Sequence, residues 1–525
     1  MEKNSVLNIK SCLISVSDKE GIVKIANKLS NKKVRIISTG NTFKELKANS
    51  VKAERVEHIT KFPEILDGRV KTLHPKIFGG ILGDINKSKH LKQMQTYNIS
   101  KIEMVIVNLY PFEEVIKKNV TLETYIENID IGGPSIIRAA AKNYISTVVL
   151  TAKQDYQLVM SEIDQLNGIS LETRKILAYT AFTKTMEYDL AISKWFSEKI
   201  LAEKNKNFYL LGDKPIKLRY GENPHQNAEL FNNKIVNEDK FYNQLNGKDL
   251  SYNNFNDLHT GLNLVNEFKE PACVIIKHAI PCGVSESKKL NNAWLNAFSA
   301  DQLSAFGGVV TFNRKVDEEL AKLISKIFLE VLAAPAFSRG ALEYLKKKVN
   351  LRVLKIKSIK DYGNASSRQV TMLANSFLIQ DRNKSVLKMK QLKFASKKKP
   401  NIKQLEDLIF ASKVVKYVRS NAIVLAKNKT TLGIGSGNTS RVDSVNFAIK
   451  KSSRIKLKVK KSILAGSIMA SDAFFPFADS IKLANKHGIV SIIQPGGSIN
   501  DKKIIDEVDK SKMSMVFTGK RSFSH

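Results

Sequence analysis

Cysteine is scarce in this sequence, and its few copies lie far apart. The 525 residues include three cysteines, Cys12, Cys273 and Cys282. An odd number at such wide spacing predicts neither a disulfide framework nor a zinc cluster. The sequence also lacks a run of about 18 apolar residues, the length that crosses a membrane, and its first residues lack the apolar stretch of a secretory signal. We therefore expect a cytoplasmic protein that requires no metal and does not contact a membrane.

Acidic residues are too few to balance the basic ones. The chain has 50 Asp and Glu against 85 Lys and Arg, a formal net charge of +35. Such an excess can mark a nucleic-acid-binding protein. Here, however, the lysines are spread over nearly every expected helix, and no aromatic residues interleave a basic stripe. A dispersed excess mainly solvates surfaces. We expect no specific nucleic-acid binding, and a polyanion-binding protein stays the alternative from another class.

The hydrophobic pattern predicts an α/β protein of several domains. At 525 residues with 43% hydrophobic content, the chain is long enough for two to four domains. Residues 11–17 read as a strand, 19–31 as an amphipathic helix and 34–38 as a second strand, and the last third again alternates strands and helices. The Lys-rich segment 382–400 has weak patterning and is expected to be a linker or exposed excursion between two subdomains.

A Lys-His pair stands where an apolar strand runs into a turn. The β-branched run 274–276 leads directly to Lys277 and His278, and Pro281 and Gly283 follow. Histidine titrates near neutrality and lysine carries a fixed donor, so the pair suits proton transfer and stabilisation of a developing negative charge. A solvated loop pair is the alternative for the motif taken alone.

The first part of the chain contains turns that suit a phosphate. Segments 15–19 and 38–42 each connect a strand to a helix and offer hydroxyl groups and free backbone N–H groups. Ordinary helix capping explains the same residues equally well. Segment 69–74 gathers Arg, Lys, Thr and His, a combination that suits an anionic guest. Asp130 precedes the glycines of segment 132–133, which permit close backbone approach.

Two loops and two rejected motifs complete the pattern. Segments 218–226 and 245–254 combine polar, aromatic, Gly and Pro residues, which is typical of binding loops. The glycine-rich segment 433–437 lacks the third glycine of a dinucleotide loop. A zinc deaminase would carry Glu and a second Cys where this chain has Ile280 and Ser285. Chemistry at Lys277 and His278 must therefore proceed without zinc.

These stretches, in this order over essentially the whole chain, resemble the bifunctional AICAR transformylase/IMP cyclohydrolase family of purine biosynthesis. The resemblance implies an α/β fold with an N-terminal methylglyoxal-synthase-like, Rossmann-type domain over residues 1–200. Two cytidine-deaminase-like α/β/α subdomains would follow over residues 205–525, split near 380–400. Members of the family are homodimers whose transformylase sites form across the interface, so a homodimer is expected here too.

For the transformylase, the resemblance implies formyl transfer from the co-substrate 10-formyltetrahydrofolate to AICAR. His278 would accept the amine proton, Lys277 would donate toward the oxyanion or the leaving folate nitrogen, and Asn421 would orient them. A carboxylate and an aromatic ring on the folate side suit the pterin. The implied substrate-binding residues of this half are Arg219, Tyr220, Gly307, Arg441, Asp472, Phe474, Arg521, Phe523 and His525.

For the cyclohydrolase, the resemblance implies dehydrating ring closure of formyl-AICAR to IMP. The implied catalytic residues are Lys71, Tyr110, Asp130 and Lys142. The implied substrate-binding residues are Ser15, Lys19, Ser38, Gly40, Thr42, Arg69, Thr72, Asn108, Gly132 and Gly133. The reaction is intramolecular, so positioning supplies much of the acceleration. No metal is implied, although the resemblance is compatible with a bound monovalent cation.

The chain departs from the family pattern at a few positions. Ile280 replaces an Asn beside the Lys-His pair, and Asn41 replaces a Gly in the phosphate turn, where Asn tolerates positive φ. Tyr144, the pair Asn438-Thr439, Ser522 and Ser524 also differ from the usual residues. We expect both reactions to survive, and a relic with a single activity is the remaining alternative.

Overall fold

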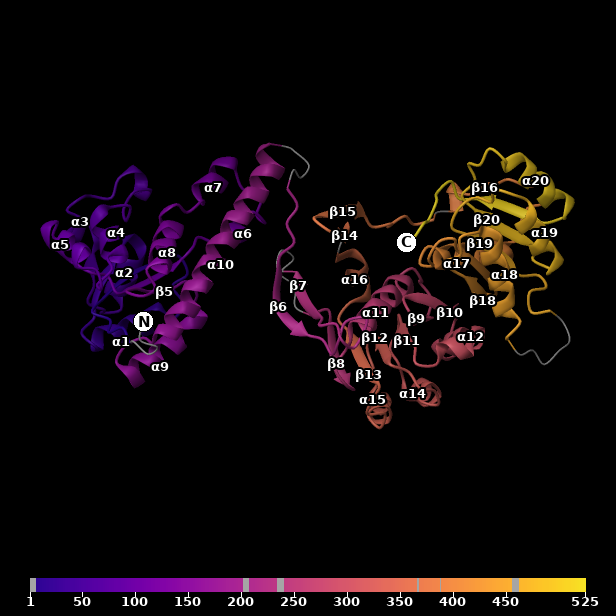
Figure 1. The fold of residues 1–525 in the computed structure, drawn as a ribbon, viewed down its shortest axis with the longest axis horizontal. Helices are drawn as coiled ribbons and strands as arrows, with labels where there is room; N and C mark the ends of the chain where they lie inside the picture. Colours follow the sequence, from indigo (N-terminus) through magenta and orange to yellow (C-terminus); the bar gives the residue numbers. More distant parts are fainter. Residues whose placement is uncertain (1–5, 202–206, 234–239, 366–367, 388, 456–461) are drawn as a thin grey trace. The chain divides into compact units, whose positions relative to one another are not determined.

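The structure is a computed structural model that describes residues 6–201, 207–233, 240–365, 368–387, 389–455 and 462–525. The chain divides into two compact units, Met1–Tyr209 and Leu210–His525. Both units are built of α-helices and β-sheets (Figure 1), which confirms the predicted α/β class. No described helix is long and apolar enough to cross a membrane.

The first unit is built on a parallel sheet with the strand order β3-β2-β1-β4-β5. Its strands are β1 (Ser11–Val16), β2 (Arg35–Ser38), β3 (Glu54–Arg55), β4 (Met104–Asn108) and β5 (Val148–Leu150). Apolar runs such as Met104–Val107 are buried because helices cover both faces of a parallel sheet. From β1 the chain adds β2 and β3 on one side of the sheet and then β4 and β5 on the other side. The order of the strands therefore reverses between β1 and β4, and ligands bind at the carboxyl ends of the strands at such a switch point.

Two hydrophobic cores lie on the two faces of this sheet. α1 (Ile22–Asn31) and α9 (Tyr156–Leu166) contribute to one core, α4 (Pro75–Leu82) and α8 (Gly132–Lys142) contribute to the other, and α10 (Leu171–Trp195) contributes to both. The predicted elements 11–17, 19–31 and 34–38 correspond to β1, α1 and β2. The helices of the unit are α1 (Ile22–Asn31), α2 (Gly40–Ala48), α3 (Val56–Thr60), α4 (Pro75–Leu82), α5 (Ser88–Thr96), α6 (Phe112–Val115), α7 (Leu122–Glu127), α8 (Gly132–Lys142), α9 (Tyr156–Leu166) and α10 (Leu171–Trp195).

The second unit contains a 12-stranded sheet with the order β16-β21-β20-β19-β17-β18-β10-β9-β11-β12-β13-β8. The first six strands along the chain are β8 (Tyr242–Asn246), β9 (Ala272–Lys277), β10 (Ile280–Glu286), β11 (Val309–Phe312), β12 (Val331–Ala334) and β13 (Arg352–Ile356). The other six are β16 (Lys393–Phe394), β17 (Ile423–Lys427), β18 (Thr430–Gly435), β19 (Ile468–Ser471), β20 (Ser491–Gln494) and β21 (Ser514–Phe517).

The order of these strands is symmetric about the pair β10–β18. In each half an antiparallel hairpin (β9–β10 or β17–β18) is followed by three parallel strands and an antiparallel edge strand. The helix before each hairpin, α11 (Tyr252–Val265) or α17 (Ile402–Val415), begins with a capping box. The helix after each hairpin is α12 (Leu290–Ala300) or α18 (Arg441–Ser452). The unit is therefore two copies of one α/β arrangement, which we call the first and the second half.

The remaining elements lie around this sheet. β6 (Gly212–Lys217) pairs with β7 (Glu229–Asn233), and β14 (Arg368–Leu373) pairs with β15 (Ser376–Asp381), each pair forming a separate hairpin. The segment 382–400, expected to be a linker, also supplies the edge strand β16, which pairs with β21. The other helices are α13 (Gln302–Ala305), α14 (Glu318–Ile324), α15 (Arg339–Leu345), α16 (Ile359–Ala365), α19 (Asp479–Lys486) and α20 (Asp501–Lys510).

Candidate functional site

The carboxyl ends of β1, β2 and β4 gather the polar residues expected to hold a phosphate. Ser15 Oγ and Thr39 Oγ1 lie 3.0 Å apart, and Thr42 Oγ1 donates to the carbonyl of Val16 at 3.0 Å. Asn108 Oδ1 accepts hydrogen bonds from the backbone N–H groups of Ser17 and Asp18 at 2.5 and 3.1 Å. These bonds fix the turn after β1 at the switch point of the sheet.

The helix α2 begins at this same edge with open space in front of it. Gly40, its first residue, has a φ of 43°, and no atom lies within 4 Å of the place where a Cβ would stand. The free N–H groups of a helix N-terminus favour an anion. Lys19, on the turn that follows β1, is half-buried. Ser38 differs from the expectation of a free hydroxyl, because its side chain is fully buried and donates to the carbonyl of Ile14.

Asp130 is held rigidly beside the N-terminus of α8. Its Oδ1 accepts from the N–H of Gly133 at 2.8 Å, and its own N–H donates to the Tyr188 hydroxyl at 2.7 Å. A Cβ on Gly133 would lie 2.3 Å from Asp130 Oδ2, so a side chain there would displace the carboxylate. Burial raises the pKa of Asp130, while the backbone N–H of Gly133 and the charge of Lys71 act in the opposite direction. A carboxyl group with a raised pKa suits proton transfer.

The other residues expected at the cyclohydrolase site are only partly brought together. Thr72 Oγ1 is 3.4 Å from the Cβ position of Gly132, so Thr72 packs against the start of α8. Arg69 forms an exposed ion pair with Glu127, and the Tyr110 ring is 44% exposed. Lys142 is the last residue of α8, whose 11 residues span about 16 Å at 1.5 Å each. The structure therefore separates Lys142 from Asp130, and its catalytic role stays a prediction.

In the second unit, Lys277 and His278 stand at the β9–β10 turn. His278 and Ala279 both have positive φ, 55° and 58°, the backbone form of a two-residue hairpin turn. Lys277 Nζ donates to the carbonyls of Gly307 and Phe306 at 2.8 and 3.1 Å. His278 is exposed. The turn therefore presents the imidazole outward and anchors the ammonium group beside Gly307.

The second half contributes a buried polar network. Arg441 forms an ion pair with Asp472 and donates to Asn421 Oδ1 at 2.8 Å. Asn421 Nδ2 donates to the carbonyls of Asn438 and Thr439 at 3.0 and 3.1 Å. The other Asp472 oxygen, Oδ2, accepts from the Ser420 hydroxyl. Because Asp472 is 1% exposed and both its oxygens are engaged, it braces Arg441 and Ser420 in this structure. Phe474 is 40% exposed.

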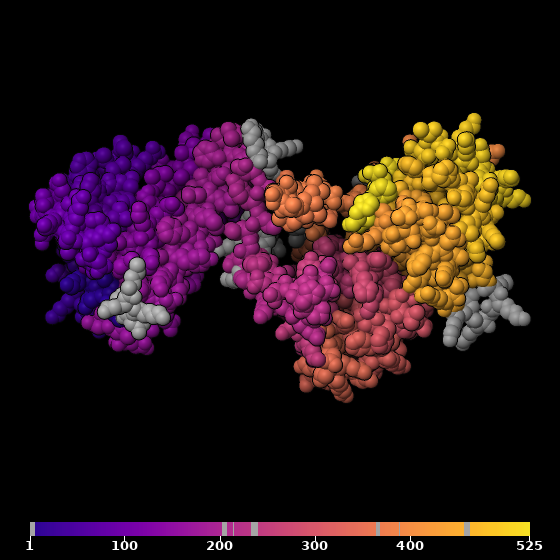
Figure 2. Space-filling model, in the orientation of Figure 1, coloured from indigo at the N-terminus to yellow at the C-terminus, as the bar shows by residue number. Residues whose placement is uncertain are grey.

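The C-terminal tail is bound to this network through its main chain. Ser522 N–H donates to the carbonyl of Asp472 at 2.9 Å, and the carbonyl of Ser524 accepts from the N–H of Ser420 at 2.9 Å. Arg521 lies over the Phe523 ring at 4.3 Å, and the Phe523 and His525 rings contact edge to face. In Figure 2 the yellow C-terminal end lies at the molecular surface. The main-chain bonds do not use the serine side chains that depart from the family pattern.

The hairpin turn and the network lie at the same end of the sheet. β10 and β18 run antiparallel with Ser285 opposite Thr430, so the start of β10 is level with the end of β18. His278 precedes β10, and Asn438 follows β18. Arg219 and Tyr220 join this region through backbone bonds to Leu250 and Tyr252, where α11 begins. Within one chain, these residues expected for the transformylase therefore lie at the same end of the 12-stranded sheet.

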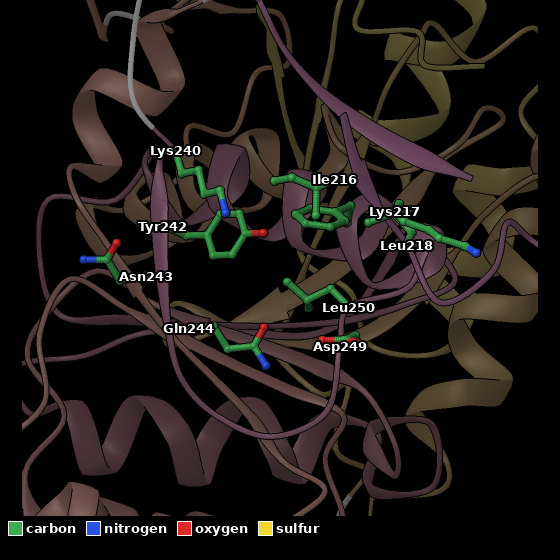
Figure 3. Close-up of a pocket in the computed structure, with 10 residues that line it drawn as sticks. Ile216, Lys217, Leu218, Lys240, Tyr242, Asn243, Gln244, Asp249 and Leu250 are labelled. Carbon is green, nitrogen blue, oxygen red and sulfur yellow. The ribbon is translucent and has the colours of Figure 1, made fainter. Parts of the chain in front are cut away.

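A cavity of about 510 Å³ lies beside the Arg219-Tyr220 segment. It is lined by residues of β6, β8 and the start of α11, and Figure 3 shows the Tyr242 and Leu250 side chains inside it, with Lys217 directed away. Lys277 and His278 are not among its lining residues. The cavity is therefore a separate space from the hairpin turn.

Sequence reasoning missed two residues that the structure brings to these sites, Ser420 and Asp257. The Asp257 carboxylate accepts the N–H of Ala279 at 2.6 Å. A repeat of the Lys-turn-Gly spacing, Lys277 to Gly283 and Lys427 to Gly433, is the sequence signal that could have led to Asp257 through its counterpart Asp407. Within the described ranges, no cluster of three or more His, Cys, Asp or Glu residues could hold a metal ion.

Two family models and several curated proteins match this chain. The family model described as AICARFT/IMPCHase bienzyme matches residues 140–451, and the MGS-like domain model matches residues 21–135. Three relatives carry the name "Bifunctional purine biosynthesis protein PurH", and each alignment covers 98% of this chain and 100% of the relative. The identities are 45% for Acetivibrio thermocellus, 47% for Thermoanaerobacter sp. (strain X514) and 45% for Persephonella marina.

Proposed function

We propose that the residues described above carry both reactions of the AICARFT/IMPCHase bienzyme family, to which this chain belongs. The enzymes of this family act in purine biosynthesis and have formyltransferase and cyclohydrolase activities. The first unit carries the MGS-like domain and is assigned the ring closure. The second unit is assigned the formyl transfer from a folate co-substrate. The observation that carries the second assignment is the common position of the Lys277-His278 turn and the Asn421–Asp472 network at one end of the sheet.

For formyl transfer, His278 is the proton acceptor and Lys277 the oxyanion donor. The amine nitrogen of AICAR forms a bond to the formyl carbon, and its proton passes to His278. The bond between the formyl carbon and the folate nitrogen then breaks, and that nitrogen takes the proton from His278, which becomes neutral again. An ammonium group has three donors, and Lys277 uses two on the carbonyls of Phe306 and Gly307. The third is left for the oxygen that becomes negative in the tetrahedral intermediate.

The remaining residues of the second unit bind and orient the substrates. Arg219, Tyr220 and the tail residue Arg521 hold the nucleotide, and Phe474 stacks on the pterin. Asp472 acts mainly through Arg441 and Ser420, because both its oxygens already accept from them. Asn421 holds the loop after β18 in place.

For ring closure, Asp130 and Lys71 assist proton transfer next to the phosphate edge. The carboxamide nitrogen attacks the formyl carbon and loses one proton. The nitrogen that carries the formyl group then loses its proton as the C=N bond of the ring forms, and the formyl oxygen leaves with both protons as water. Because the reaction is intramolecular, holding the nucleotide by its phosphate at the start of α2 supplies much of the rate. The raised pKa of Asp130, caused by burial, suits a group that gives and takes a proton.

We also propose that the active form is a homodimer with transformylase sites at the interface. An apolar stripe on α10 supports it: Ile176, Tyr179, Phe182 and Met186 recur along one side of this helix and are exposed, Tyr179 by 75%. Such a stripe on a well-formed helix indicates a contact surface. The mass of the native protein in solution, measured by light scattering, tests this point.

A two-input assay tests the function. Purified protein receives AICAR with 10-formyltetrahydrofolate in one tube and preformed formyl-AICAR in the other, with IMP followed in both against enzyme-free controls. IMP in both tubes supports the proposal, and repeating the assay with potassium replaced by choline tests a monovalent cation. IMP in the second tube alone would contradict the transformylase assignment. IMP in neither tube would contradict both assignments.

A further inference from the structure

The two halves of the second unit carry the same turn with different residues. In the first half the turn between β9 and β10 is His278-Ala279, with φ of 55° and 58°. In the second half the turn between β17 and β18 is Asn428-Lys429, with φ of 54° and 53°. Both turns follow a lysine, Lys277 or Lys427. The duplicated scaffold thus provides an internal control for the turn that carries the proposed chemistry.

In each half an aspartate on the preceding helix holds the turn. Asp257 and Asp407 both stand five residues after the first residue of their helices, α11 and α17. Asp407 uses both oxygens, which accept from the N–H groups of Asn428 and Lys429 at 2.9 and 2.7 Å. Asp257 uses one, Oδ1, which accepts from Ala279 at 2.6 Å. Its Oδ2 makes no hydrogen bond within the part of the chain that the structure describes.

Asp257 also differs from Asp407 in the charges around it. The ionisable groups that act on Asp257 are His278 and Lys277, from the turn, and Glu330, from the segment before β12. Burial raises the pKa of Asp257, whereas the Ala279 N–H and the charges of His278 and Lys277 lower it. The groups that act on Asp407 are the turn N–H groups, Lys403 and Lys429, and no histidine is among them.

We propose that Asp257 is a positioning residue of the formyl-transfer site. Its Oδ1 fixes the left-handed turn that aims His278, and its charge faces the imidazole and stabilises the protonated form that arises when His278 takes the amine proton. The proposal rests on the proposed function of Lys277 and His278. Asp257 touches neither substrate nor co-substrate in this role.

Asp257 contributes a hydrogen bond to the turn and a negative charge, and different variants remove one or the other. Asp257→Asn keeps an oxygen to accept the Ala279 N–H and removes only the charge. Asp257→Glu keeps the charge and displaces the carboxylate by one methylene group. Asp407→Asn is the matched control, since it removes the corresponding charge in the half without a histidine at the turn.

The experiment measures kcat and KM for AICAR in formyl transfer for the wild type and the three variants. We expect kcat of Asp257→Asn to fall about tenfold with KM within about twofold of the wild type, because the loss concerns the base and not binding. The split between kcat and KM is the decisive readout, since a general loss of structure would change both.

Asp257→Glu, which keeps the charge, should retain more of kcat than Asp257→Asn, and Asp407→Asn should match the wild type in kcat and KM. Ring closure of formyl-AICAR, which uses the other unit, should stay unchanged in every variant. An unchanged kcat in Asp257→Asn, or an equal loss in Asp407→Asn, would overturn the proposal while leaving the proposed function intact. A wild type that makes no formyl-AICAR would instead overturn the proposed function, and this inference with it.

Discussion

The two halves of the second unit have the same backbone at the hairpin but different chemistry on it. Lys277 donates to the Gly307 carbonyl at 2.8 Å, and Lys427 donates to the Ala465 carbonyl at 2.6 Å, next to Gly466. Gly307 and Gly466 both have positive φ, 65° and 73°. The halves then diverge: the first has a histidine at the turn and a carboxylate oxygen free beside it, whereas the second has Asn428 and a fully engaged carboxylate. The scaffold gives both turns the same geometry, and under the proposed function the turn residue accounts for proton transfer at the first turn and not at the second.

Exchanging the turn residues between the two halves should have the largest effect on formyl transfer. His278→Asn keeps a residue that tolerates positive φ, as Asn428 does, and removes the base. We expect formyl transfer to fall about a thousandfold, within the range of general base catalysis, while ring closure stays unchanged. Asn428→His is the control and should alter neither activity. Steady-state rates of both reactions check this, and more than a tenth of wild-type formyl transfer in His278→Asn would contradict it.

Removing the lysine before each turn should have the next largest effect. Lys277→Met is expected to lower kcat of formyl transfer about a hundredfold, the loss seen when one oxyanion donor is removed. Lys427→Met should leave kcat unchanged and lower the free energy of unfolding by about 1 kcal/mol, since it loses only a hydrogen bond to a carbonyl. Rates and urea unfolding of the two variants measure this difference. Equal losses of kcat would show that the ammonium group acts through the fold.

Adding a methyl group at the paired glycines should affect both halves alike. A Cβ on Gly283 would lie 2.1 Å from the carbonyl oxygen of Ala297, and a Cβ on Gly433 would lie 2.1 Å from that of Ala448. Both oxygens belong to helix backbone that cannot move alone. We expect Gly283→Ala and Gly433→Ala each to lower the free energy of unfolding by about 2 to 3 kcal/mol. Denaturant unfolding measures these free energies. A clear difference between the two variants would show that the halves are not equivalent at these glycines.

Ile280→Asn should have the smallest effect. Ile280 begins β10 as Thr430 begins β18, and it is only partly buried. We expect the substitution to change formyl transfer by less than about threefold, as for most changes that disturb no core or network. A large gain in kcat would instead support the view that this chain is a relic with one impaired activity. Wild-type and Ile280→Asn rates measured side by side distinguish these outcomes.

Local sequence signals predicted the elements that depend on local physics. The apolar run before Lys277 defines a strand end, and the hydrophobic pattern at the N-terminus predicts β1, α1 and β2 with each boundary within three residues of the structure. The Lys-rich segment 382–400 reads as a linker or exposed excursion, because the two residues of β16 become a strand only by pairing with β21. Ser38 and Asp472 are residue types that often bind ligands. In the fold both are buried, and their side chains already bind neighbouring protein groups. The role of Asp257 depends on a contact across 22 residues, which no local pattern contains.

Because β10 pairs with β18, the 12-stranded sheet can be completed only late in synthesis on the ribosome. When residue 286 has been made, β10 exposes an unpaired edge, and its partner is not available until residues 430–435 follow. Unpaired edges of incomplete sheets recruit other chains. Like charges repel, so the net charge of +35 opposes such recruitment of neighbouring copies.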